Sequence, residues 1–250
     1  MKIIKNYNDF LVENANVNEG VYDPGILKAF FMAGGPGSGK SYVATELFDF
    51  PKGIVNSVSY ETGLKLVNND NAFEKALKDQ GLSPAELSKY AKDPEKWAEV
   101  MLLRDKAKSI TKKLQANYLT GRLGQVIDGT GKDFKKIEKQ RKIYQDLGYD
   151  TYMVFVNTSK EVALERNQMR ERKLADEMVS KMWQDVQNNM GKFQRLFGSK
   201  YTLIVDNSSS EDNSIINLAG KEIAKHLSTP IENNLGKIWI KNELENKKRS

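Results

Sequence analysis

One segment of the sequence combines glycines with a lysine and a serine at the spacing of a phosphate-binding loop. The residues Gly34-Gly35-Pro36-Gly37-Ser38-Gly39-Lys40-Ser41 fit the pattern G-x-x-x-x-G-K-[ST] between an apolar run, Ala29–Ala33, and a helix expected from Lys40 to Leu47. Glycines let backbone N–H groups surround phosphate oxygens, and a helix amino terminus adds the positive end of its dipole. We expect the loop to bind a nucleoside triphosphate, with Lys40 on its β- and γ-phosphates and the Ser41 hydroxyl on Mg²⁺.

A carboxylate ends another apolar run, Val126-Ile127-Asp128. The carboxyl end of a buried parallel strand lies at the ligand edge of a sheet, so Asp128 is expected to hold the Mg²⁺ as a Walker-B-type acid. A helix-capping role is the alternative. Gly129 follows Asp128, so the second acid with which a motor ATPase activates water is absent, and phosphoryl transfer to another acceptor is favoured.

A second acid, Asp70, closes the run Leu66-Val67-Asn68-Asn69-Asp70. At the same edge of the sheet it would face the acceptor, as the base for an acceptor hydroxyl. An ordinary turn rich in Asn and Asp explains the same residues.

Three arginines, Arg166, Arg170 and Arg172, lie in a charged segment that follows a fourth apolar run. Arg166 and Arg170 are four residues apart and share a helix face, from which they could close over the nucleotide and stabilise the transferring phosphoryl group. Because acidic residues are interleaved with them, a solvated surface of i,i+4 ion pairs is the alternative.

The elements that position these residues follow from the alternation of apolar runs with amphipathic stretches, which predicts βαβ units and a parallel sheet. One helix is expected to bury a stripe of Val100, Leu103, Ala107, Ile110, Leu114 and Tyr118, and Thr158 with Glu161 forms a capping-box pattern for another. The expected strands are Ala29–Ala33, Leu64–Val67, Gln125–Asp128, Tyr152–Val156 and Tyr201–Val205.

Composition excludes several chemistries. The 250 residues contain no cysteine and one histidine, His226, so disulfides, thiol nucleophiles and zinc sites built from cysteines or several histidines are absent. The net charge of +6 favours polyanionic partners, although a solvated basic surface explains it as well. With neither a membrane span nor a signal sequence, the expectation is a cytoplasmic protein without membrane contact.

Taken together, these motifs resemble the P-loop kinases of the zeta toxin and polynucleotide 5′-kinase group, over about residues 27–228. The run Asp128-Gly129-Thr130 is similar to the Glu-Gly-Thr of zeta toxins. The resemblance implies a three-layer α/β fold with a five-stranded parallel sheet and the P-loop strand in its middle. It also implies ATP or another nucleoside triphosphate with Mg²⁺, an arginine-bearing lid, a hydroxyl acceptor, and adenine near Asn207 and Ser208. Polynucleotide kinases carry an arginine three residues after the acid of strand two, where this sequence has Phe73, and Lys65, Lys75 or a lid arginine would have to replace it.

The expected organisation is an extension at 1–20, a kinase domain at 21–228 with a helical insert at 74–120 and a lid at 166–176, and a tail at 229–250. Leu11-Val12-Glu13 resembles the end of a processed leader in proteins of tailed bacteriophages, which makes a virion location an alternative.

The favoured function is transfer of the γ-phosphate of ATP to a hydroxyl of a nucleotide, sugar nucleotide or nucleic-acid end. Two alternatives stay open: an NTPase associated with nucleic acid, and a virion protein that only binds nucleotide.

Overall fold

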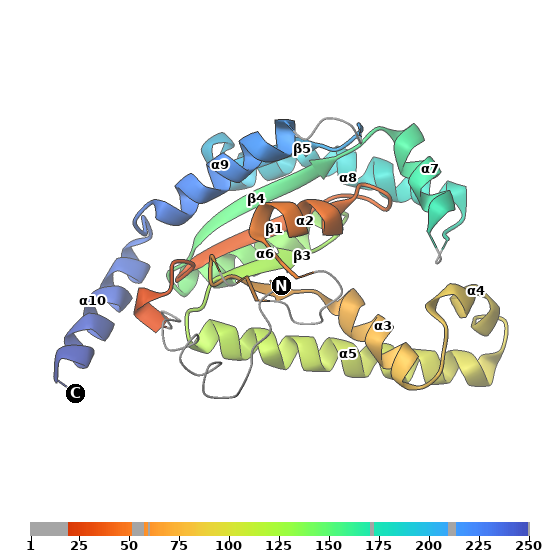
Figure 1. Cartoon of the computed structure of the whole chain (residues 1–250), viewed down its shortest axis with the longest axis horizontal. Coiled ribbons are helices and arrows are strands. Elements are labelled where there is room, and N and C mark those ends of the chain that lie inside the picture. The colour runs from red at the N-terminus through yellow and green to blue at the C-terminus, as the bar shows by residue number, and fades with distance from the viewer. Residues whose placement is uncertain (1–19, 52–57, 60, 171–172, 210–213, 250) are drawn as a thin grey trace, which may run out of the picture.

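The computed structural model describes residues 20–51, 58–59, 61–170, 173–209 and 214–249. Its centre is a parallel sheet in the order β2-β3-β1-β4-β5 (Figure 1). The strand before the phosphate-binding loop, β1, is therefore the middle strand, as expected. Each predicted strand is present, with ends that differ by at most two residues. The bounds are β1 Lys28–Ala33, β2 Lys65–Val67, β3 Gln125–Asp128, β4 Asp150–Asn157 and β5 Thr202–Asp206.

Helices cover both faces of this sheet, because β1 and β4 are apolar on both sides. On one face, α2 (Lys40–Phe48) and α9 (Ser214–Ser228) pack over Phe30, Met32 and Val154. On the other, α6 (Phe134–Asp146) and α8 (Asp176–Phe197) pack over Phe31 and Phe155. The result is the three-layer α/β fold, in which the carboxyl ends of the strands form one edge.

The segment between β2 and β3 forms α3 (Asn69–Asp79), a 3₁₀ turn at Pro84–Glu86, α4 (Leu87–Tyr90) and α5 (Pro94–Thr120). It has a small apolar core of its own, in which Phe73 and Leu77 pack with Val100 and Leu103. The expected stripe on α5 is wrong at Ile110, which is 58% exposed. Thr111 is buried in its place. Its hydroxyl donates to the Ala107 carbonyl oxygen, so burial leaves this polar group with a partner on its own helix.

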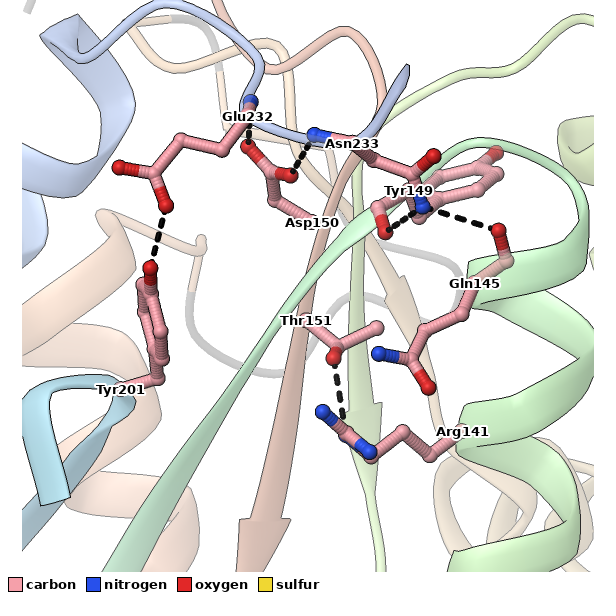
Figure 2. Close-up of a pocket in the computed structure, with 8 residues that line it drawn as sticks. All are labelled: Arg141, Gln145, Tyr149, Asp150, Thr151, Tyr201, Glu232 and Asn233. Atoms are coloured by element: carbon pink, nitrogen blue, oxygen red, sulfur yellow. Dashed lines mark hydrogen bonds between the residues drawn. The ribbon is translucent and has the colours of Figure 1, made fainter. Parts of the chain in front are cut away.

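The chain after Pro230 continues into α10 (Asn234–Arg249), whose Trp239 and Ile240 pack against the α6 and α8 side of the core. Polar contacts hold this segment at the amino edge of the sheet, where β4 begins (Figure 2). Asp150, the first residue of β4, accepts from the backbone N–H groups of Glu232 and Asn233 and from Lys28 Nζ at 3.2 Å. Tyr201 and Glu232 are hydrogen-bonded there, and Arg141 Nε donates to Thr151 Oγ1 at 3.0 Å. The hollow beside these groups has a volume of about 190 Å³.

Two expectations about the ends and surfaces of the chain remain. Leu11-Val12-Glu13 lies outside the described residues. Within the described part of the chain, no helix is both long enough and apolar enough to cross a membrane.

The remaining helices are a 3₁₀ turn at Gly20–Tyr22, α7 (Lys160–Met169) and a 3₁₀ turn at Ser199–Tyr201.

Candidate active site

The loop Gly34–Ser41 joins the carboxyl end of β1 to α2, and its backbone depends on two glycines. Gly37 and Gly39 have φ of 76° and 78°, in the left-handed region that other residues rarely adopt. A Cβ on Gly37 would also lie 2.3 Å from the Ala163 carbonyl oxygen. Gly39 precedes α2 and has no side chain to cap it, so the first N–H groups of the helix stay available for phosphate.

Asp128 ends β3 and lies beside Met32 of β1, next to the loop. Its Oδ1 is 3.8 Å from Lys40 Nζ, and its Oδ2 accepts from Asn68 Nδ2 at 2.8 Å. Oδ1 is buried and has no hydrogen-bond partner within the described part of the chain. Burial raises the pKa of the Asp128 carboxyl; the positive charge of Lys40 opposes this rise, and the negative charge of Asp70 adds to it.

Asp70 lies in the first turn of α3, where its side chain is exposed. Asn68 caps this helix: its Oδ1 accepts from the Asp70 backbone N–H at 2.7 Å. The structure therefore brings Lys40, Asp128 and Asp70 to one edge of the sheet. Sequence reasoning missed Asn68, although a strand followed by Asn-x-Asp at the start of a helix is a recognisable capping signal.

Arg166 lies on α7, and its Nη1 donates to the Asn207 carbonyl oxygen at 2.8 Å. Asn207 is 6% exposed and follows β5, and its Nδ2 donates to the Ser38 carbonyl oxygen at 2.8 Å. A Cβ on Gly39 would lie 2.3 Å from Asn207 Nδ2 and 3.6 Å from Arg166 Nη1, so both side chains support the loop. Within the described residues Arg166 forms no ion pair, which the solvated-surface alternative would require of it.

The other two arginines differ from Arg166. Arg170 is exposed directly after the last residue of α7, and Arg172 lies outside the described residues. The predicted capping residue of α7 is wrong by one position: Ser159 Oγ accepts from the Val162 backbone N–H, at 3.2 Å. Thr158 is 2% exposed, and its buried Oγ1 has no hydrogen-bond partner among the described residues, so this side chain does not cap the helix.

The two lysines considered as substitutes for an arginine at position 73 are engaged elsewhere. Lys65 begins β2 at the amino edge and pairs with Asp23 at 3.0 Å. Lys75 is exposed and pairs with Asp79 on its own helix. Phe73 is itself 4% exposed, with the Arg104 guanidinium 5.9 Å from its ring centroid.

The residues at this edge fit Mg²⁺ held together with a nucleotide. Mg²⁺ in such sites takes one or two protein oxygens and completes its shell with phosphate and water. The unpartnered Asp128 Oδ1 and the exposed Ser41 offer that set. The described residues hold no cluster of three or more acidic or histidine side chains that would bind a metal without the nucleotide.

The fold and this edge define a P-loop protein of the kinase-like type. Residues 30–193 match the model of the AAA_33 family, described as an AAA domain, and the chain belongs to that family. None of the curated proteins matches the chain.

The chain is similar to several solved structures. A structure of the PezAT toxin–antitoxin system of Streptococcus pneumoniae aligns with a TM-score of 0.51 at 12% identity, over 89% of this chain and 94% of that one. Shikimate kinase from Bacteroides thetaiotaomicron gives 0.45 at 14% identity, over 81% and 99%. Deoxyadenosine kinase from M. mycoides with bound dATP gives 0.39 at 16% identity, over 81% and 100%.

Proposed function

We propose that this protein is an ATP-dependent kinase that transfers the γ-phosphate to a hydroxyl of a nucleotide, sugar nucleotide or nucleic-acid end. The observation that carries the proposal is the meeting of Lys40, Asp128 and Asp70 at the carboxyl edge, with Lys40 Nζ 3.8 Å from Asp128 Oδ1. A cation, a buried acid and an exposed acid beside a phosphate-binding loop are the parts that phosphoryl transfer requires.

Each residue has a distinct task in this reaction. The N–H groups of Gly34–Ser41 bind the β- and γ-phosphates, and Lys40 neutralises charge on them. Ser41 and Asp128 hold Mg²⁺, which when bound offsets further phosphate charge. Arg166 and Arg170, with Arg172, stabilise the charge of the transferring group, and Asn207 supports the loop beside the adenine.

Asp70 is the group that faces the acceptor. Its exposed carboxylate accepts the hydroxyl proton as the new O–P bond forms and the bond from the γ-phosphorus to the β,γ-bridging oxygen breaks, which leaves ADP. Because the transition state is loose, this base mainly orients the hydroxyl.

Labelled ATP incubated with a panel of nucleotides, sugar nucleotides and DNA or RNA 5′-ends tests the proposal. Transfer of label to a hydroxyl is expected, and Asp70→Asn should reduce it about 10²-fold or more while ATP still binds. Asn69→Ser, a change at the neighbouring exposed residue, is the control and should retain transfer. Hydrolysis of ATP without transfer to any member of the panel, equal in the wild type and in Asp70→Asn, would contradict the proposal.

A further inference from the structure

The Asn68 side chain forms hydrogen bonds with the backbone of Asp70 and with the carboxylate of Asp128. Its Oδ1 accepts from the Asp70 backbone N–H at 2.7 Å, and its Nδ2 donates to Asp128 Oδ2 at 2.8 Å. We propose that Asn68 is a positioning residue, which holds the Asp128 carboxylate so that Oδ1 alone is presented to Lys40 and Mg²⁺. This inference rests on the proposed function, since it concerns the same metal acid.

The two hydrogen bonds fix the orientation of the Asn68 amide. A backbone N–H can only donate, so the atom that accepts from Asp70 must be the amide oxygen. The amide nitrogen then necessarily points to Asp128, and a carboxylate oxygen is a suitable acceptor for it. The helix cap of α3 thus determines which group meets the metal acid.

The two oxygens of Asp128 have different surroundings. With Oδ2 occupied by Asn68, rotation of the carboxylate would break that hydrogen bond. Oδ1 is left buried without a hydrogen bond in the described part of the chain, 3.8 Å from Lys40 Nζ. A buried oxygen without a donor is costly unless a cation reaches it, so the arrangement is prepared for one.

An amide at position 68 does what an acid could not. An aspartate at position 68 would cap α3 equally well, because Asn and Asp are both preferred at this position. It would, however, turn a carboxylate towards Asp128 Oδ2 and remove the one donor to that atom among the described residues. Partners that orient a metal ligand in this way are typically worth 10- to 100-fold in metal affinity.

The test, made in the whole 250-residue chain, separates two roles of Asn68. One is the cap of α3, and the other is the hydrogen bond donated to Asp128. Asn68→Ser retains a good cap but cannot reach Asp128, and Asn69→Ser is the matched control at an exposed neighbour. Binding of ADP is measured by calorimetry in EDTA and across a series of Mg²⁺ concentrations, with thermal unfolding as a check on the fold.

We expect Asn68→Ser to bind ADP in EDTA as the wild type does, and to need about 10-fold more Mg²⁺ for the metal-dependent gain in affinity. Asn68→Asp should lose at least as much. An unchanged Mg²⁺ requirement in Asn68→Ser would overturn the inference, and so would a lower requirement in Asn68→Asp, because residue 68 would then reach the metal itself.

The readout does not depend on phosphoryl transfer, which keeps the two proposals apart. A shifted Mg²⁺ requirement without transfer to any acceptor would refute the kinase and leave the role of Asn68 intact. A wild-type chain in which Mg²⁺ does not change ADP affinity would refute both.

Discussion

The two edges of the sheet differ in how many hydrogen-bond partners their buried carboxylates have. At the amino edge, Asp150 is saturated by Lys28 and two backbone N–H groups. At the carboxyl edge, Asp128 Oδ1 has no hydrogen bond from any described residue, and Lys40 Nζ lies 3.8 Å from it. A saturated carboxylate holds segments together, whereas a buried one with a free oxygen is available to a ligand.

Other unpartnered side-chain atoms agree with this contrast in part. Ser38 Oγ, in the phosphate-binding loop, and Thr158 Oγ1, directly after β4 at the carboxyl edge, are also buried without a partner in the part of the chain that the structure describes. Within the same described ranges, Arg122 Nε and Gln125 Nε2, near the amino end of β3, have no partner either. These two are nitrogen donors, however, and no buried carboxylate oxygen is left free beside them among the described residues. The free acceptor, and not burial alone, distinguishes the carboxyl edge.

The largest expected effect is a loss of stability when the buried ion pair at the amino edge is removed. Lys28 is 2% exposed, and Lys28→Met would leave Asp150 buried without its cation. Removing one partner of a buried pair costs about 3–5 kcal/mol, so the free energy of unfolding in urea should fall by that order. ATP binding by the folded fraction should not change. Loss of nucleotide affinity at full stability would mean that the two edges are not independent.

The next effect is on the carboxyl edge. Lys40→Ala removes the charge that meets both the phosphates and Asp128, and should lower turnover about 10²- to 10³-fold. The melting temperature should fall less than in Lys28→Met, because Lys40 Nζ is 3.8 Å from Asp128 Oδ1 and donates no hydrogen bond to it, whereas Lys28 is hydrogen-bonded to Asp150. Lys142→Ala, at an exposed lysine paired with Asp146, is the control. Unchanged ATP turnover in Lys40→Ala would contradict the proposed kinase function.

A smaller effect separates two lid arginines. Arg166→Ala and Arg170→Ala should each lower kcat about 10- to 100-fold, the worth of one charge-assisted hydrogen bond made in the transition state. Arg166 also holds Asn207 against the loop, so its variant should weaken ATP binding as well, while Arg170→Ala should leave it intact. Steady-state kinetics with separate measurement of ATP affinity checks both. If neither variant changes kcat, the arginines only form a charged surface.

The smallest expected effect is a pH dependence of the free energy of unfolding, which arises from His226 near the amino edge of the sheet. His226 is 5% exposed, and its ring packs at a tilt of 38° against Tyr152, with ring centroids 4.4 Å apart. Burial lowers the pKa of its imidazole. The unfolded state therefore binds the proton more readily, so stability is complete above the ordinary pKa and falls as the pH drops below it.

His226 is the only histidine in the chain, so its contribution can be isolated. His226→Phe should flatten the pH dependence of the free energy of unfolding between about pH 5 and about pH 7. The change should be a fraction of the loss in Lys28→Met. An equal slope in both proteins would show that other groups carry it.

Several features follow from local sequence, because the physics that decides them is local. The loop Gly34–Ser41 needs left-handed backbone at Gly37 and Gly39, and only glycine adopts it without strain. Apolar runs long enough to be buried on both faces predict the strands and their parallel arrangement. Since parallel strands end at a common edge, the sequence also placed Asp128 and Asp70 near Lys40.

Tertiary structure decided what depends on contacts between distant segments. The bond from Asn207 to Ser38 joins residues 169 positions apart, and no pattern in the sequence predicts it. Packing against neighbouring helices buried Thr158 and moved the cap of α7 to Ser159, and it exposed Ile110 in favour of Thr111. The sequence by itself determined which groups could do chemistry and at which edge. Only the packed molecule decided that Asn68 holds one oxygen of Asp128 and leaves the other free, because that choice requires three strand and helix ends to meet in space.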